Sequence, residues 1–428
     1  MGKDLVKKVL LYRWLIFSIM ALCYVVVYFH RLSPAVVAID LQTAFHTSGG
    51  FMGLMASAYF YPYALMQFPA GLMSDSLGPR KTVTVFLLLA SVGSIAFGLS
   101  QTVEQAVASR ILVGLGVSMV FIPTMKILSQ WFRVGEFAFM VAILNTMGGM
   151  GALTAATPLA LMTTSFGWRV SFELIGIITL FMGLMVWVFV RNRPADLGWP
   201  TLAQIDHSGS GDVPKPREIG LLEGAKTVFT EKFFWPIAVW FFLVCGIFFG
   251  FGGLWAGPYL MHVYGLDRAQ AGSILNMIAV GLILGSPFHS FVSNRILKSR
   301  KKTLILSTFC LSLLLIFINA FPSGLPIWGL YVIMLLLSVT ASAIVVIAFT
   351  TTKELFPVEI AGTSVGAVNL FPFLGGAIFQ PVIGSILDCY EKTYIGTYSI
   401  EAYSTMLMTL LVAALIALAS TFFMKETL

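Results

Sequence analysis

The residues best suited to binding chemistry lie within the first long apolar stretch of the chain, residues 12–38. Tyr24, Tyr28 and Arg31 are spaced by four and three residues, which places them on one face of a helix. A charge as deep in a membrane as Arg31 is costly unless it faces a cavity or a partner. Because a guanidinium binds a carboxylate through two parallel hydrogen bonds, this face predicts a site for an anionic group. The alternative is that Arg31 extends to the membrane surface.

A second stripe of polar side chains follows in the next apolar stretch. Tyr59, Tyr63 and Gln67 recur every four residues, again on one helical face. We expect them to line the same cavity, although ordinary helix packing produces the same pattern. Lys126 either lines the inner half of the cavity or extends to the nearer surface. Five more side chains within apolar stretches are candidates for binding a substrate: Trp240, Trp255, Asn276, Asn369 and Gln380.

The composition identifies the chain as a membrane protein that crosses the bilayer many times. Of its 428 residues, 58% are hydrophobic and 11% are charged, whereas a soluble domain carries about 25% charged residues. A helix needs about 20 residues to cross a bilayer. Twelve stretches of suitable length are present: 12–38, 51–74, 82–100, 104–131, 137–161, 170–191, 233–258, 268–292, 303–321, 327–352, 362–387 and 401–424.

One long polar stretch, residues 192–232, divides the chain into two halves. Its proline, glycine and serine content is typical of a linker. We therefore expect a six-helix bundle over residues 1–191, a cytoplasmic linker over 192–232 and a second six-helix bundle over 233–428. Within the linker, residues 217–231 predict a short amphipathic helix lying on the membrane.

The distribution of basic residues predicts the orientation. An even number of crossings puts both termini on one side. Twenty Lys and Arg residues fall on that side, and three, namely Arg169, Arg268 and Lys392, fall on the other. Because cytoplasmic loops carry the excess of basic residues, we expect both termini in the cytoplasm and the protein in the bacterial inner membrane.

A short turn between the second and third apolar stretches carries the most specific motif. Residues 71–81 read G-L-M-S-D-S-L-G-P-R-K, and this pattern resembles the loop between helices 2 and 3 of the major facilitator superfamily. In that family the element braces the helix bundles on the cytoplasmic side and breaks during inward opening. The resemblance therefore implies gating roles for Gly71, Asp75, Gly78, Arg80 and Lys81.

A second element opens the fourth stretch. Arg110-Ile-Leu-Val-Gly114-Leu-Gly116 resembles the R-x-x-x-G-x-G pattern of the same family. Its glycines allow a neighbouring backbone to approach closely. We expect Arg110 and Gly114 to serve helix packing and gating.

The first stretch resembles one branch of this superfamily. His30-Arg31-Leu-Ser-Pro34 is similar to a pattern of organic-anion carriers, in which the arginine binds a substrate carboxylate or phosphate. This chain departs by having His30 where those carriers often have Asp, and Val117 where they tend to have Glu. Residues 58–69 resemble bacterial nutrient-uptake members, including amino-acid carriers.

The resemblance implies an all-α membrane protein of twelve transmembrane helices, in two six-helix bundles related by pseudo-two-fold symmetry. The implied function is secondary active or facilitative transport of a small organic solute, a carboxylate-bearing anion or an amino acid, by alternating access. Efflux of a drug-like or siderophore-like compound is the alternative, although Thr157 replaces a glycine of drug antiporters. A solute sensor that does not transport is the third possibility.

The energy source depends on which groups can titrate inside the membrane. All nineteen acidic residues fall in loops or near helix ends, whereas ion-driven carriers usually need a buried ionisable group. His30 is the titratable residue adjacent to Arg31. We therefore expect either exchange or facilitated movement without protons, or proton coupling through His30.

Other classes of function lack supporting patterns. The five histidines show no metal-ligand spacing, and the sequence contains no phosphate-binding loop or nucleophile motif. We therefore expect no enzyme activity, metal or cofactor. The basic residues cluster in loops, so the net charge of +7 indicates orientation and no nucleic-acid partner. The expected partners are a small-molecule solute and the lipid bilayer, and the expected state is a monomer.

Overall fold

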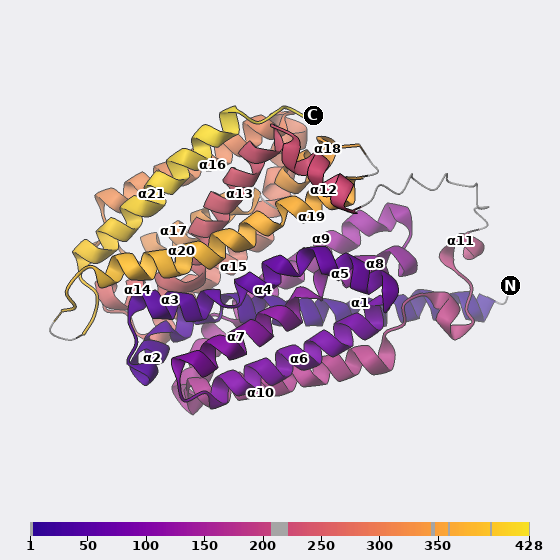
Figure 1. The fold of residues 1–428 in the computed structure, drawn as a ribbon, viewed down its shortest axis with the longest axis horizontal. Coiled ribbons are helices and arrows are strands. Elements are labelled where there is room, and N and C mark those ends of the chain that lie inside the picture. The colour runs from indigo at the N-terminus through magenta and orange to yellow at the C-terminus, as the bar shows by residue number, and fades with distance from the viewer. Residues whose placement is uncertain (1–2, 207–220, 344–346, 358–359, 394–395, 428) are drawn as a thin grey trace.

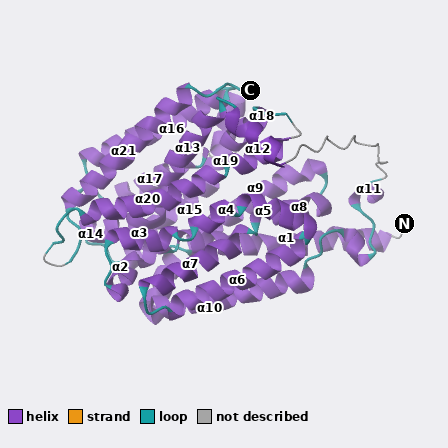
Figure 2. Ribbon diagram, viewed as in Figure 1, coloured by secondary structure: helices purple, strands orange, loops and turns teal. Residues whose placement is uncertain are grey.

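The computed structural model describes residues 3–206, 221–343, 347–357, 360–393 and 396–427, and within them it contains helices and loops but no β-strand (Figures 1 and 2). The first half comprises α1 (Lys3–Leu32), α2 (Pro34–Phe45), α3 (Gly49–Ser57), α4 (Phe60–Leu65), α5 (Gln67–Ser76), α6 (Pro79–Leu99), α7 (Val103–Ser118), α8 (Phe121–Trp131), α9 (Val134–Thr154) and α10 (Thr157–Phe189).

The second half comprises α13 (Phe234–Ile247), η2 (Phe248–Trp255), α14 (Ala256–Tyr264), α15 (Arg268–Phe291), η3 (Val292–Ile296), α16 (Arg300–Ala320), α17 (Ile327–Ala341), α18 (Phe349–Glu354), α19 (Ala361–Val368), α20 (Leu370–Asp388) and α21 (Ile400–Phe422). Between the halves lie η1 (Pro194–Leu197), α11 (Leu202–Ile205) and α12 (Leu221–Thr230). The predicted amphipathic helix is α12, and residues 207–220 of the linker lie outside the described part.

These helices make twelve membrane crossings. Nine stretches of helix among the described residues are long and apolar enough to cross a membrane. One of them, Gly135–Phe189, has 55 residues and turns at the non-helical Gly167, so it crosses twice. Two further crossings are divided into shorter helices, over residues 49–76 and 327–354. The predicted all-α fold with twelve transmembrane helices is confirmed.

Prolines explain several helix breaks that hydropathy does not show. The first crossing is longer than predicted, because α1 begins at Lys3 and the chain continues through α2 to Phe45. It is interrupted at Ser33, because the next residue, Pro34, has no N–H group to donate to the carbonyl of His30. The second crossing is likewise interrupted near Pro62 and Pro69.

The seventh crossing contains eight residues of π-helix, η2, between α13 and α14. This segment is fully buried and holds Gly250, Gly252 and Gly253. π-Helical turns are rare and concentrate at functional sites. The glycine-rich sequence therefore interrupts regular helix geometry beside the centre of the molecule.

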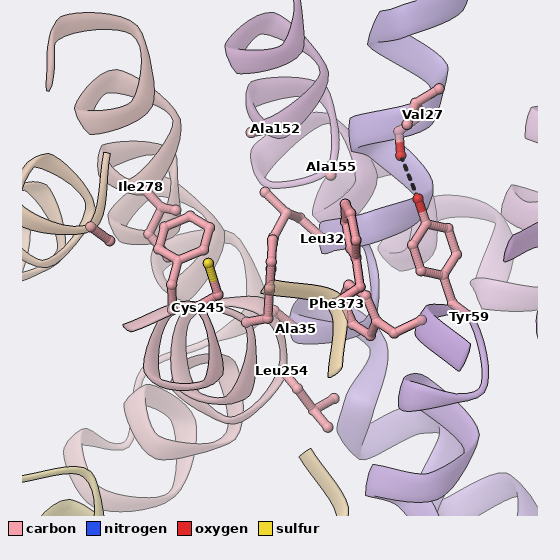
Figure 3. Close-up of a cluster of buried hydrophobic side chains, with 14 of the residues drawn as sticks. Val27, Leu32, Ala35, Tyr59, Ala152, Ala155, Cys245, Leu254, Ile278 and Phe373 are labelled. Carbon is pink, nitrogen blue, oxygen red and sulfur yellow. Dashed lines mark hydrogen bonds between the residues drawn. The ribbon is translucent and has the colours of Figure 1, made fainter. Parts of the chain in front are cut away.

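The two halves lie side by side, α1–α10 in one group and α13–α21 in the other (Figure 1). The apolar core joins them. Figure 3 shows Leu32 and Ala155 of the first half close to Leu254, Ile278 and Phe373 of the second. Close packing of this kind replaces hydrophobic burial as the main source of helix association in a membrane.

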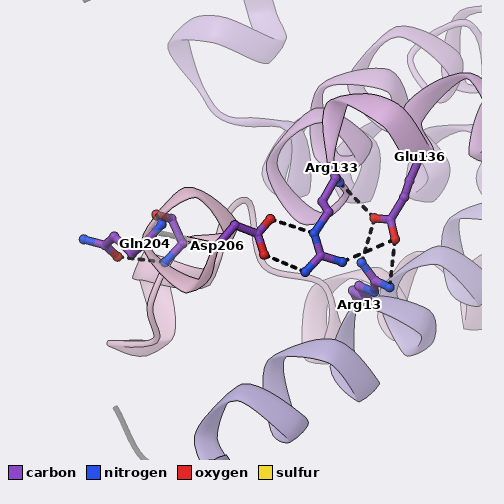
Figure 4. A network of polar contacts seen from close by, with 6 residues as sticks. Arg13, Arg133, Glu136, Gln204 and Asp206 are labelled. Carbon is purple, nitrogen blue, oxygen red and sulfur yellow. Dashed lines mark hydrogen bonds and ion pairs between the residues drawn. The ribbon is translucent and has the colours of Figure 1, made fainter. Parts of the chain in front are cut away.

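The start of the linker is attached to the first half by a charged network (Figure 4). Arg133 Nε and Nη2 donate to the two oxygens of Asp206 at 2.7 Å each. Arg13 Nη1 and the Arg133 backbone N–H donate to Glu136 Oε2 at 2.8 and 3.0 Å. The network therefore connects α1, α9 and α11.

Candidate functional site

A cavity of about 870 Å³ lies between the two halves. It extends from Arg31 to Asp75 and Lys353, whose exposed side chains mark its mouth. The first half contributes residues of α1, α4, α5, α8 and α9. The second half contributes residues of α13, η2, α15, α17, α18, α19 and α20. We refer to the end of the molecule at the mouth as the Asp75 side and to the opposite end as the Asp388 side.

Arg31 lies at the inner end of this cavity and is covered by aromatic rings. Its guanidinium carbon is 4.5 Å from the ring centre of Tyr28 and 4.9 Å from that of Tyr63, both in the first half. The second half contributes Phe373 at 5.1 Å and Phe249 at 5.8 Å. Cation–π attraction therefore stabilises the charge, which has no carboxylate partner among the described residues.

One edge of the Arg31 guanidinium remains without a hydrogen bond. Nε and Nη2 are buried and have no partner in the described structure. These two nitrogens lie on the same edge of the planar group and together form the donor pair that binds a carboxylate or sulfonate bidentately. The site thus contains a free donor pair beneath aromatic rings.

The Asp388 side is closed by contacts between the halves. The backbone N–H groups of Gly49 and Gly50, at the N-terminus of α3, donate to the two oxygens of Asp388 at 2.7 Å each. Tyr398 also donates to Asp388, at 2.9 Å, and accepts from Gln42 at 3.0 Å. A carboxylate at a helix N-terminus is favoured by the free N–H groups and by the helix dipole.

Further polar contacts reinforce this closure. Arg268 forms an ion pair with Asp40 of α2 and donates to Thr163 at 3.3 Å. Asn276 of α15 donates to Thr157 Oγ1 of α10 at 2.8 Å. Because each contact joins the two halves, all of them must separate before this side can open.

On the Asp75 side, Asp75 is paired within its own half. Lys126 Nζ donates to Asp75 Oδ1 at 2.5 Å and to the Ser74 carbonyl at 3.1 Å. Deeper in the cavity, Asn369 donates to Gln67 Oε1 at 2.7 Å and connects α5 to the second half. The structure is therefore open on the Asp75 side and closed on the Asp388 side.

Six of the twelve predicted substrate-binding residues line this cavity. The structure brings together Arg31, Tyr24, Tyr28, Tyr63, Gln67 and Asn369. Tyr59 is fully buried beside them: its ring stacks on that of Tyr63 at 5.6 Å, and its hydroxyl donates to the Val27 carbonyl (Figure 3). Lys126 lies beside the mouth in its pair with Asp75.

The remaining four candidates lie away from the cavity, and each donates a hydrogen bond within the protein, although Gln380 Oε1 is buried without a partner in the described structure. Trp240 donates to Thr308 at 2.7 Å, and Trp255 donates to the Gln380 carbonyl at 2.9 Å. Gln380 Nε2 donates to the Phe249 carbonyl within η2 at 3.0 Å. Asn276 joins α15 to α10 as described above. These polar atoms serve helix packing in this conformation, a role that a buried polar residue in a single sequence does not reveal.

The structure does not place His30 with Arg31. His30 is fully buried on another face of α1, with Nε2 3.5 Å from Thr179 Oγ1 of α10. Arg110 Nη1 donates to the His30 carbonyl at 3.1 Å and Nη2 to the Ala56 carbonyl at 3.4 Å. Gly114 lies against the Tyr59 backbone, where an added Cβ would be 2.1 Å from the carbonyl oxygen.

The predicted gating residues of the turn have different surroundings. Gly78 has a φ of +83°, which favours glycine, and immediately precedes α6. Gly71 lines the cavity with open space around it. The Arg80 guanidinium donates to the Trp187 carbonyl and lies 4.5 Å from the Trp187 ring, whereas Lys81 is exposed.

Sequence reasoning missed three groups of residues. Phe249 and Phe373 cover Arg31, but a phenylalanine in an apolar stretch carries no sign of its neighbour. Lys353 at the cavity mouth is one of the twenty basic residues on the predicted cytoplasmic side, and the sequence offers no sign that it lines a cavity. Asp388 could have been found, because it is an acidic residue at the end of one apolar stretch and the Gly49–Gly50 pair begins another.

Twelve crossings in two groups, with a cavity between them that holds a buried arginine and reaches one surface, define a membrane carrier of small solutes. The chain belongs to the Major Facilitator Superfamily, whose family model matches residues 16–380. The predicted family membership is confirmed.

The individual relatives share low sequence identity with this chain. The chain is 24% identical over 293 residues to a probable sulfoacetate transporter of Cupriavidus necator, covering 67% of this chain and 66%, just under two thirds, of that relative. It is 21% identical over 399 residues to the membrane sensor protein UhpC of Salmonella typhimurium, covering 91% and 88%. A solved bacterial homologue of the human lysosomal transporter Spinster, in an inward-facing, occupied conformation, has a TM-score of 0.73 at 17% identity, covering 99% and 97%.

Proposed function

We propose that this protein is a secondary transporter that moves a small organic anion across the bacterial inner membrane by alternating access. The observation that carries the proposal is the free Nε and Nη2 edge of Arg31 at the inner end of the cavity. A buried donor pair without a partner is costly, and an anionic ligand would satisfy both nitrogens at once. The similarity to a probable sulfoacetate transporter also supports an organic anion.

The cavity favours an anion over an amino acid. An amino acid needs an acceptor for its ammonium group near the arginine. In the described lining, the single acidic residue is Asp75, which lies at the mouth and already accepts a hydrogen bond from Lys126. An ammonium group beside Arg31 would therefore lack a carboxylate partner and be repelled by the guanidinium.

The orientation proposed here places both termini and the Asp75 side in the cytoplasm. The excess of Lys and Arg in the loops on that side supports this assignment. The present conformation then faces inward. Residues 1–191 and 233–428 move as two units about the linker 192–232, and a monomer suffices because the cavity is formed within one chain.

A solute sensor is the second candidate, because the similarity to a membrane sensor protein covers most of the chain. Efflux instead of uptake would use the same cavity. Sensor and transporter differ in turnover, since a sensor binds its solute without moving it. Counterflow of a bound solute in proteoliposomes separates the two, and the direction follows from flux measured under imposed gradients.

The experiment that tests the proposed class of solute is a thermal-shift screen of the purified protein in detergent. Organic carboxylates and sulfonates are each compared with the neutral amide of the same skeleton. At least one anion should raise the melting temperature while its amide does not. Stabilisation by amides and anions alike would contradict the role of Arg31.

A further inference from the structure

We propose that the anion bound at Arg31 has an apolar body, aromatic or branched aliphatic, and is not a polyhydroxylated acid. This inference rests on the proposed function and concerns the part of the ligand that Arg31 does not touch. It follows from how polar and apolar groups are distributed over the cavity.

The walls beyond Arg31 are apolar. Phe121 and Met125 of α8 face the cavity from the first half, and Phe248, Leu282 and Phe349 face it from the second. An apolar ligand surface gains by leaving water for such walls, whereas a hydroxyl would lose its hydrogen bonds to water without replacement.

The amide side chains of the lining are already used within the protein. Gln67 accepts from Asn369 at 2.7 Å and donates to the Tyr63 carbonyl at 3.0 Å. Asn145 donates to the Val141 carbonyl at 3.1 Å, and Ser342 donates to the Val339 carbonyl at 2.6 Å. A sugar acid carries several hydroxyl groups, and these side chains offer them few free donors and acceptors.

Of the remaining lining hydroxyl groups, three belong to tyrosines near Arg31 and the fourth belongs to Thr363 of α19. The rings of Tyr28 and Tyr63 contact Arg31, and the Tyr24 ring centre is 5.3 Å from that of Tyr28. These tyrosines can therefore assist in binding the anionic group. Between the charged end at Arg31 and the charged mouth at Asp75 and Lys353, the cavity wall is mainly apolar, which is the complement of an amphipathic anion.

Ring displacement over Arg31 favours the same class of ligand. Because Nε and Nη2 are buried, we expect an anion that binds them to displace one of the rings over the guanidinium, such as Phe249 or Phe373. A displaced phenyl ring can pack against an apolar ligand body and remain out of water. Against a polyhydroxylated body, the same ring would face groups that need hydrogen bonds.

The test uses the full-length purified protein and two sets of probes of similar size. One set contains benzoate, phenylacetate, hexanoate and benzenesulfonate, and the other contains gluconate and glucuronate. Binding is measured by thermal shift and isothermal titration calorimetry. We expect at least one probe of the first set to bind at least tenfold more tightly than either sugar acid, because a hydrophobic pocket discriminates by roughly 10-fold or more for each added apolar group.

A variant pair adds a structural control. Phe373→Leu keeps an apolar wall but removes the ring over Arg31, and it should weaken phenylacetate binding several-fold. Phe379→Leu is the matched control, because Phe379 lies on the same helix, packs against Phe242 and does not line the cavity. It should leave phenylacetate binding unchanged.

The outcomes separate this inference from the proposed function. Tighter binding of gluconate or glucuronate, or no binding by any probe of the apolar set, would overturn the apolar body. If phenylacetamide binds as tightly as phenylacetate, the anionic class fails while the apolar body is retained.

Discussion

Arg31 is held in an apolar interior without an acidic partner. Each of its contacts with an aromatic face contributes about 0.5–2 kcal/mol, and four rings surround it. Two of these rings belong to each half of the protein. The anion proposed to bind at Arg31 would therefore change contacts between the halves, which is the differential interaction that a conformational change requires.

Substitution of a second single residue, His30, tests how transport is coupled to an energy source. Because His30 packs against Thr179 and does not line the cavity, we expect His30→Gln to retain solute exchange in proteoliposomes. Solute-driven proton flux is measured in parallel with a pH-sensitive dye. Proton flux in the parent that is lost in His30→Gln would show that His30 couples transport to protons, in which case exchange without protons would be wrong.

At the scale of helices, the N-terminus of α3 and the carboxylate of Asp388 form a contact between the halves that we expect to act as a gate. An anion at a helix N-terminus stabilises by about 0.3–2 kcal/mol. Asp388→Asn should therefore shift the population toward opening on the Asp388 side by a factor of about 2–30. Labelling of single cysteines placed on the two sides reports the shift.

Glu391→Gln is the matched control for that prediction. Glu391 is an exposed acidic residue three positions further along the chain and has no hydrogen bond or ion pair in the described structure. Equal labelling in the Asp388→Asn variant and this control would contradict a gating role for Asp388.

Asp75 is expected to stabilise closure of the Asp75 side, whereas Asp388 stabilises closure of the opposite side. Asp75 lies near the end of α5, as Asp388 lies at the end of α20, and α5 contacts α19 of the second half. When the Asp75 side closes, we expect Asp75 to bind the N-terminus of α19. Asp75→Asn should then increase labelling on the Asp75 side.

The pair with Lys126 offers the corresponding control. Lys126→Met removes the partner that Asp75 has in the present conformation. If the only role of Asp75 is to pair with Lys126, the two variants will show equal cysteine labelling on the Asp75 side. A gating role instead predicts more opening on the Asp75 side in Asp75→Asn than in Lys126→Met.

At the scale of the whole molecule, attachment of the linker to the first half should depend on pH. Hydrogen bonds from Arg133 hold the pKa of the Asp206 carboxyl below its ordinary value of 3.8. The pair therefore contributes fully above this ordinary value, and its contribution is lost as the pH falls through the lower folded-state value. Acidification, or Asp206→Asn at neutral pH, should release α11.

Hydrogen exchange of residues 202–205 measures this release. Exchange should accelerate in Asp206→Asn at pH 7, whereas Asp196→Asn, which removes an ion pair of the same linker with Arg193, should leave it unchanged. Unaltered exchange in Asp206→Asn would show that the ion pair does not hold α11 in place.

Much of this architecture could be predicted from the sequence, because hydropathy determines which segments enter the membrane. The position of Arg31 was predictable for the same reason, since a charge at that depth needs a cavity. The π-helix η2 could not be predicted, because it depends on local backbone geometry. The contacts of Phe373 and Asp388 depend on residues more than 300 positions away, which periodicity along one helix does not reveal.

Counterflow in proteoliposomes with an anion identified by the thermal-shift screen tests the central claim most directly. The parent should accumulate labelled anion. Arg31→Gln should abolish both accumulation and binding while the protein still inserts and elutes as a single species. Arg31→Lys should be impaired by about 10-fold or more, because an ammonium cannot reproduce the bidentate geometry. Unchanged affinity and counterflow in Arg31→Gln would contradict the assignment of Arg31 as the anion-binding residue.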